Sequence, residues 1–382
     1  MAPRIIFLFS DTGGGHRASA NAVAAAMQAQ YPGRFEIEMI DPFVAGSRPF
    51  LRWAVYRYNW VIKHMPRTYG LLFHSTDNRV MIKAAIRTLG RQLRPGIARG
   101  VGDLPPIGIV SFHPLTNHVT VETLDRLGLD IPFVTVITDM TEVHRFWMTR
   151  KADVVVVPSA EARKLCISKG LDPRRVHVAG LPVNPRFTGA LHGAGKSRLR
   201  AQLGLSDRTT LLLVSGGEGA GRLGAQARAL DRAGLGVQLL VVCARNEKLR
   251  KKLDAEQWRG DVHVYGFVDN MPELMQASDA IVTKAGPGTI SEALISGLPI
   301  FLTGYVPGQE EGNVKFVTHQ RVGFYTPRVR KLVKLVRENL TSDHEEFERM
   351  QGRAEAVGRS DAAAEIAQLI AAAVQPQHAG PF

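Results

Sequence analysis

The chain has 382 residues, of which 45% are apolar and 22% charged, and its formal net charge is +13. This composition excludes a disordered chain, and the length exceeds what one ordinary core accommodates, so two domains are expected. Two cysteines without ligand-like spacing argue against a structural zinc site and favour a reducing compartment. The positive charge predicts an acidic partner, for which nucleic acid, an anionic membrane surface and a phosphorylated small molecule are the three classes.

Short apolar runs alternate with helical periods along the whole chain. Strands are predicted over residues 4–10, 35–40, 107–111, 133–138, 153–157 and 176–179, and then over 210–215, 238–243, 262–265, 280–283 and 299–302. This alternation predicts an α/β protein of two Rossmann-like domains, each with a doubly wound parallel sheet. No apolar run approaches 18 residues, so no transmembrane segment is expected, and the apolar start predicts a first strand rather than a signal peptide.

A stretch rich in proline and glycine, residues 181–198, separates the two patterns. We therefore expect a first domain over residues 1–187 and a second over 188–342. Helices over about 343–372 are expected to pack back on the first domain.

The first predicted strand leads into SDTGGGHRASA, residues 10–20. A glycine turn after a strand often holds a phosphate, but the loose GxGxxA match is weak and no GK[ST] follows. The alternative is that Gly14 and Gly15 allow a ligand to approach the backbone closely while His16 acts as a base. A dinucleotide-dependent enzyme would account for this turn alone.

Aromatic and basic residues interleave between residues 47 and 78. Such rings and cations are typical of a helix in the lipid headgroup layer, where the cations meet anionic lipid. An ordinary core helix and a nucleic-acid groove use the same residue types, although no RNP, KH or helix-turn-helix signature supports nucleic-acid binding. The residues predicted to contact the membrane are Arg52, Trp53, Tyr56, Arg57 and Trp60.

Two further glycine turns follow strands in the second half. The first, SGGEGAGRLG at residues 215–224, suits a diphosphate because its backbone N–H groups are free. The second, TKAGPGTISEAL at 283–294, predicts a helix from about Thr289 with Glu292 in its first turn, where a carboxylate could accept both hydroxyls of a ribose. GQEEGN, at 308–313, places Gln309 and Glu310 where open α/β sheets bind ligands, and their side chains suit a polyhydroxylated molecule.

These blocks, with SFHPLTNH (111–118), VTVITD (134–139) and GLPVNPRF (180–187), occur in the order of one enzyme family. Over about residues 5–330 the chain resembles the monogalactosyldiacylglycerol synthases of plastids and the related processive diacylglycerol glucosyltransferases. It is more remotely similar to the GlcNAc transferase that completes lipid II. The resemblance implies a GT-B glycosyltransferase with a lipid-acceptor domain, a UDP-sugar domain and an active site in the cleft. It also implies inversion, no bound metal or cofactor beyond UDP-sugar as co-substrate, and peripheral attachment to the cytoplasmic side of a membrane.

The resemblance also assigns roles to residues. It gives the general base to His16 and the ribose to Glu292, and the hexose to Gln309 and Glu310. It assigns uracil to the backbone near Phe267 and Val268. The diphosphate falls to two turns, which consist of Ser215, Gly216 and Gly217, and of Gly286, Pro287, Gly288 and Thr289.

The expected reaction moves galactose or glucose from a UDP-sugar to the hydroxyl of 1,2-diacylglycerol, with a polyprenyl lipid as the alternative acceptor. His16 suits the base because the positive end of the following helix disfavours its protonated form. Asp139 and His113 are candidates to orient the base or the acceptor. No nucleic-acid partner is expected, and the oligomeric state stays open.

Overall fold

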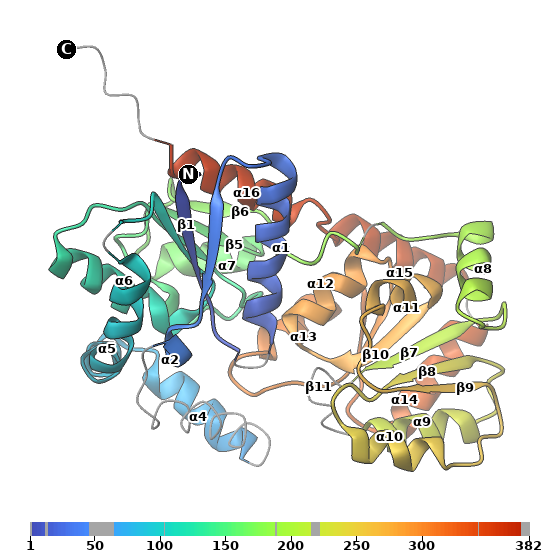
Figure 1. Cartoon of the computed structure of the whole chain (residues 1–382). Helices are drawn as coiled ribbons and strands as arrows, with labels where there is room; N and C mark the ends of the chain where they lie inside the picture. Colours follow the sequence, from blue (N-terminus) through green and yellow to red (C-terminus); the bar gives the residue numbers. More distant parts are fainter. Residues whose placement is uncertain are drawn as a thin grey trace. The chain divides into compact units, whose positions relative to one another are not determined.

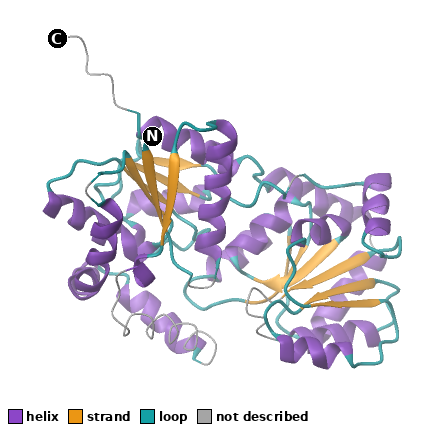
Figure 2. Ribbon diagram, in the orientation of Figure 1, coloured by secondary structure: helices purple, strands orange, loops and turns teal. Residues whose placement is uncertain are grey.

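The computed structural model describes residues 2–11, 14–45, 65–102, 104–187, 189–214, 222–342 and 344–375, and the statements below concern these residues. The chain divides into two compact units. The first comprises Met1–Pro185, Pro307–Gln309 and Asp361–Phe382, and the second comprises Arg186–Val306 and Glu310–Ser360. Each unit contains one sheet with helices on both of its faces (Figure 2).

The first unit contains a six-stranded parallel sheet in the order β2-β1-β3-β4-β5-β6. In register, Ile5 of β1 lies opposite Ile37 of β2 and Gly108 of β3. Because helices cover both faces, the inner strands β1, β3, β4 and β5 are mostly buried apolar runs, whereas the edge strand β2 (EIEMI) alternates polar and apolar residues. Their bounds are β1 (Arg4–Leu8), β2 (Glu36–Ile40), β3 (Gly108–Ser111), β4 (Phe133–Val136), β5 (Val154–Val157) and β6 (Val176–Val178).

Helices from both ends of the described chain complete this unit. The first helix, α1, packs on the last, α16, and Val23 and Met27 share a buried cluster with Ile366 and Ile370 (Figure 1). The helices of the unit are α1 (Gly15–Gln30), α2 (Pro42–Ala45), α4 (Pro66–Thr76), α5 (Arg79–Val101), α6 (Pro114–Leu127), the 3-10 helix η1 (Arg145–Trp147), α7 (Ala160–Ser168) and α16 (Ala362–Ala373).

The second unit repeats the plan with the order β12-β11-β10-β7-β8-β9, again with parallel pairs. Its strands are β7 (Thr210–Val214), β8 (Gln238–Val242), β9 (Val262–Tyr265), β10 (Ala280–Lys284), β11 (Ile300–Gly304) and β12 (Gly323–Tyr325). Its helices are α8 (Gly193–Gln202), α9 (Leu223–Arg232), α10 (Glu247–Asp254), α11 (Met271–Ala277), α12 (Pro287–Ile295), α13 (Glu311–His319), α14 (Val329–Val336), η2 (Arg337–Ser342) and α15 (His344–Val357).

Two doubly wound parallel sheets confirm the predicted fold class. The C-terminal helices differ from the expectation, because only α16 joins the first unit, whereas α15 packs on α12 in the second. Gly358, directly after α15, lies against the backbone of Leu294 in α12. A Cβ at this position would come within 2.8 Å of the Leu294 carbonyl group, so glycine allows the close contact. Among the helices that the structure describes, none has the length and apolar character needed to cross a bilayer.

Candidate functional site

The strand order of the first sheet reverses between β1 and β3, and ligands bind at the carboxyl ends of strands at such a reversal. Three segments meet there. The segment after β1 carries His16 at the start of α1, the loop after β3 carries His113, and the loop after β4 carries Thr138 and Asp139. Residues predicted from separate motifs are thereby brought together.

His16 is the second residue of α1, two positions after the glycine that caps the helix. Gly14 is the N-cap with φ of 77°, a conformation that favours glycine. The His16 Nδ1 lies 2.9 Å from the Thr138 Oγ1, and its ring centroid is 4.7 Å from that of His113. Burial lowers the pKa of His16 from 6.5 to about 4, and a hydrogen bond with the Phe112 backbone opposes this only in part. The ring is therefore neutral at pH 7, and burial is the main cause.

His113 and Asp139 both have structural partners. His113 is buried, and its Nδ1 accepts a hydrogen bond from the Leu115 N–H at 3.3 Å, which caps α6. Burial and the neighbouring His16 lower the pKa of His113 well below 6.5. The Asp139 carboxylate accepts hydrogen bonds from the Trp147 Nε1 at 2.6 Å and from the Gln309 Nε2 at 3.2 Å. The polar side chain within hydrogen-bond distance of the His16 ring is that of Thr138, which was not predicted from the sequence.

In the second unit, the strand order reverses between β7 and β10, and a predicted glycine turn follows each of these strands. After β10, Gly286 is the N-cap of α12 and Pro287 its first residue. Proline is common at the first position of a helix, because its fixed φ suits the helix and it has no N–H group that would lack a partner there. The prediction that Glu292 lies in the first turn is therefore wrong, because the helix begins two residues earlier and places Glu292 in the second turn.

The Glu292 carboxyl is largely enclosed. Burial raises its pKa from 4.5 to about 7, and no other cause contributes. Within the described residues no side-chain or backbone donor bonds to it. A carboxylate withdrawn from water without a protein donor is suited to accept hydrogen bonds from a ligand.

Gln309 and Glu310 are engaged by the protein in this structure. Gln309 belongs to the first unit, where its amide oxygen also accepts a hydrogen bond from the Tyr69 hydroxyl at 3.1 Å. Glu310 is buried and accepts hydrogen bonds from Lys284 at 2.6 Å and from the Val306 N–H at 2.8 Å. Lys284 is a second residue that the sequence argument missed.

Sequence similarity to known proteins identifies the family of this chain. The chain is 37% identical to the chloroplast monogalactosyldiacylglycerol synthase of Spinacia oleracea over 373 residues, which is 95% of this chain and 71% of the spinach protein. The chain belongs to the monogalactosyldiacylglycerol synthase family. The profile of that family matches residues 16–183, and the profile described as the C-terminal domain of glycosyltransferase family 28 matches 210–370. Monogalactosyldiacylglycerol synthase 1 of Arabidopsis thaliana is 35% identical and covers 95% of this chain and 69% of its own length.

Solved structures agree on the GT-B fold of this family member. MurG of Acinetobacter baumannii aligns with a TM-score of 0.62 at 16% identity, over 97% of this chain and 99% of MurG. HepE of Anabaena in complex with UDP-glucose aligns with a TM-score of 0.57 at 16% identity, over 97% of this chain and 98% of HepE.

The remaining predicted residues of this synthase-family chain fall into two groups. Gly14 and Gly15 are exposed with open space around them, and Phe267 is 68% exposed with the Arg245 guanidinium 5.6 Å from its ring centroid. Val268 follows it in the loop between β9 and α11. Ser215, Gly216, Gly217, Arg52, Trp53, Tyr56, Arg57 and Trp60 lie outside the described residues.

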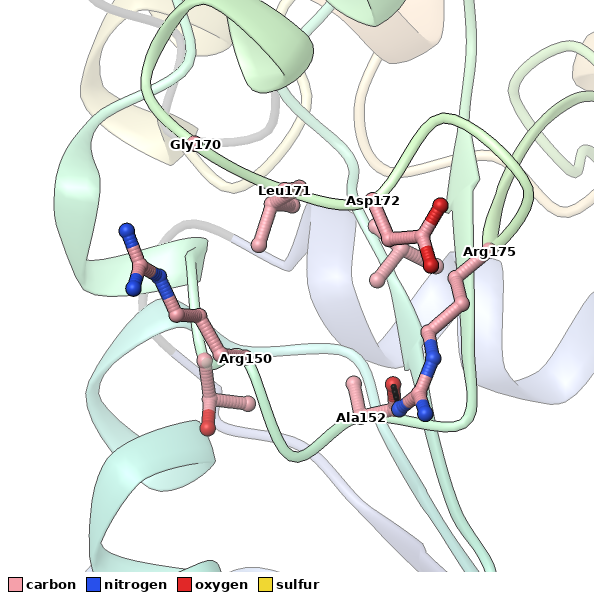
Figure 3. A pocket seen from close by; sticks show the side chains of 8 residues that line it. Arg150, Ala152, Gly170, Leu171, Asp172 and Arg175 are labelled. Atoms are coloured by element: carbon pink, nitrogen blue, oxygen red, sulfur yellow. Dashed lines mark hydrogen bonds between the residues drawn. The ribbon is translucent and has the colours of Figure 1, made fainter.

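A separate pocket lies in the first unit. Its lining includes residues just before β5 and β6, so the pocket lies at the amino ends of these strands. His16 follows the carboxyl end of β1, so the predicted site lies at the other end of the parallel strands. Arg150 and Arg175 lie on two sides of the pocket (Figure 3). Its lining residues are Thr149, Arg150, Ala152, Val155, Gly170, Leu171, Asp172 and Arg175.

Proposed function

We propose that this chain is an inverting, metal-independent hexosyltransferase that moves galactose from UDP-galactose to the primary hydroxyl of 1,2-diacylglycerol. The observation that carries the proposal is the 37% identity with the spinach enzyme over 95% of this chain. The spinach and Arabidopsis relatives, at 37% and 35% identity, are both monogalactosyldiacylglycerol synthases, which favours galactose over glucose.

His16 is proposed as the general base. The diacylglycerol hydroxyl attacks the anomeric carbon as the bond to the β-phosphate oxygen breaks, UDP leaves with the bonding electrons, and the hydroxyl proton passes to His16. A base must be unprotonated before the reaction, and a pKa of about 4 meets this condition at neutral pH. For Nε2 to accept the proton, Nδ1 must carry the ring hydrogen, and the Thr138 oxygen at 2.9 Å can accept it.

Glu292 is proposed to accept hydrogen bonds from the two ribose hydroxyls of UDP. Its carboxylate has no described donor, so binding UDP would supply the hydrogen bonds that it lacks in the protein. The turn Gly286–Thr289 is proposed to hold the diphosphate through backbone N–H groups at the start of α12.

We also propose that the first unit contacts an anionic membrane surface through α4 and α5. The exposed residues Arg79, Lys83, Arg87 and Arg91 recur every four positions and so share one face of α5. None of them forms an ion pair with a described carboxylate, and Arg79 at the helix N-terminus opposes the helix dipole, so helix stability does not account for this stripe. Large apolar side chains are exposed nearby, namely Leu71 (74%), Leu72 (52%), Val80 (76%) and Met81 (45%). Cations beside exposed apolar groups suit anionic lipid headgroups and the acyl boundary beneath them.

The test of the reaction uses purified protein in vesicles that contain diacylglycerol, with radiolabelled UDP-galactose or UDP-glucose and analysis of the lipid product. We expect a labelled monoglycosyl lipid with the anomeric configuration inverted, and more product from UDP-galactose. His16→Ala should lower transfer by about 10² to 10⁴, with UDP affinity retained. His319→Ala is the matched control, since His319 is exposed on α13. Absence of labelled lipid from either donor would refute the proposed reaction.

A further inference from the structure

Lys284 is the last residue of β10, beside the strand-order reversal of the second sheet. The ladder between β10 and β11 shifts at this point, because Thr283 lies opposite Leu302 whereas Lys284 lies opposite Gly304. A shift of this kind redirects a side chain at the end of a strand. Lys284 therefore departs from the regular ladder where the proposed diphosphate site begins.

The Lys284 ammonium is held by one buried carboxylate. Its Nζ lies 2.6 Å from the Glu310 Oε1, while the Glu310 Oε2 accepts the Val306 N–H at 2.8 Å. The Glu310 side chain is 7% exposed, but that of Lys284 is 41% exposed. Both carboxylate oxygens are thus engaged by the protein, whereas the ammonium has three donors and only one described partner.

The ammonium also lies beside the start of α12. A Cβ on Gly286 would come 3.3 Å from the Lys284 Nζ, so the absence of a side chain at position 286 leaves room for it. The first helical bond runs from the Ile290 N–H to the Gly286 carbonyl at 3.0 Å, and no side chain caps the helix. The N–H groups of Gly288 and Thr289 precede that bond, so backbone donors and a held cation lie at the same end of α12.

We propose that Lys284 stabilises the departing diphosphate of UDP, and that Glu310 is a positioning residue that holds the Lys284 ammonium in place. This inference rests on the proposed function. As the bond from the anomeric carbon to the β-phosphate oxygen breaks, that oxygen gains the electron pair, and Lys284 donates an N–H to the diphosphate without transferring its proton. A fixed cation there performs the charge stabilisation that metal-independent transfer needs.

The proposal changes the role expected for Glu310. Contact with the hexose would require Glu310 to give up its bonds to Lys284 and Val306 while it is still buried, and an unpaired buried carboxylate is costly. As a positioning residue it keeps both bonds. The two roles predict different effects of Glu310→Gln on the binding of UDP without a sugar: weaker binding if Glu310 positions Lys284, and unchanged binding if it contacts the hexose.

The experiment measures UDP affinity by calorimetry, and turnover with UDP-galactose, for Lys284→Met, Glu310→Gln and the double variant. We expect Lys284→Met to weaken UDP binding by about 10- to 100-fold. It should lower kcat by about 10². Glu310→Gln should also weaken UDP binding. The double variant should bind UDP no more weakly than Lys284→Met does, because each single change already removes the same Lys284–Glu310 ion pair. The double variant leaves no unpaired carboxylate, so it also tests the proposal if Lys284→Met folds poorly.

Lys331→Met is the matched control, because Lys331 is exposed on α14. The role of Lys284 is refuted if Lys284→Met and the double variant bind UDP and turn over as this control does. The positioning role of Glu310 is refuted if Glu310→Gln leaves UDP affinity unchanged and raises KM for UDP-galactose alone. Failure of the unsubstituted protein to bind UDP would instead refute the proposed function, so the two failures are distinguishable.

Discussion

Replacing Glu292 with glutamine is expected to stabilise the second unit and to weaken UDP binding. Burial raises the pKa of the folded-state carboxyl from 4.5 to about 7. At about 1.4 kcal/mol for each pH unit, the ionised carboxylate costs the fold at most about 3.5 kcal/mol. Glutamine has nearly the same shape without the charge, so Glu292→Gln should recover much of this free energy at pH 8.

The pH dependence has a definite sign. Below pH 4.5 the carboxyl is protonated in both the folded and the unfolded chain, so its pKa change costs no stability. Between pH 4.5 and about 7 only the unfolded chain loses the proton, and the wild-type free energy of unfolding falls relative to that of the variant. Above pH 7 both states are ionised and the difference between the proteins stays constant.

Urea unfolding at pH 5, 6, 7 and 8 measures this difference, and calorimetry at pH 8 measures UDP affinity. Glu348→Gln on α15 is the control, because Glu348 is exposed and has no described ion pair, so its difference from wild type should not change with pH. A difference for Glu292→Gln that is equal at pH 5 and pH 8 would refute the burial argument. Unchanged UDP affinity would refute the ribose assignment.

Four other outcomes are expected. Because the pKa of His16 is about 4, kcat at saturating UDP-galactose, where Glu292 already binds the ribose, should stay level from pH 8 to about 5, and a fall centred near pH 6.5 would contradict the burial of His16. Trp147→Phe removes the 2.6 Å hydrogen bond to Asp139 and should cost about 1–3 kcal/mol in urea unfolding at pH 7. Gly323→Ala would place a Cβ 2.0 Å from the Ile300 carbonyl oxygen, so thermal unfolding should show a large loss of stability or no folded protein. EDTA should leave the transfer rate unchanged, since the proposed charge stabilisation uses Lys284 and backbone N–H groups.

The fold could be predicted largely because parallel strands covered on both faces are continuous apolar runs. Each of the eleven predicted strands has an observed counterpart within a few residues, as β7 at Thr210–Val214 shows. The strand that was missed, β12, is only the three residues Gly323–Tyr325. So short a segment has no period of its own and forms a strand because β11 pairs with it.

The candidate site was predictable only where a motif is local. His16 and the turn at Gly286 lie directly after strands, so their place at the carboxyl edge followed from the sequence. Thr138 meets His16 across 122 positions of the chain, and Glu310 meets Lys284 across 26. Such pairs depend on which strands are neighbours in the sheet, and residue spacing alone does not determine that order.

The packing of α16 has a consequence for how the protein is made. Ile366 and Ile370 of α16 complete the buried cluster that contains Val23 and Met27, although the whole second unit is translated between them. A nascent chain therefore cannot close its first core by the usual N-terminal-first order. Until α16 leaves the ribosome, the apolar face of α1 that packs on it is uncovered, and it stays so for the whole time that the second unit is translated.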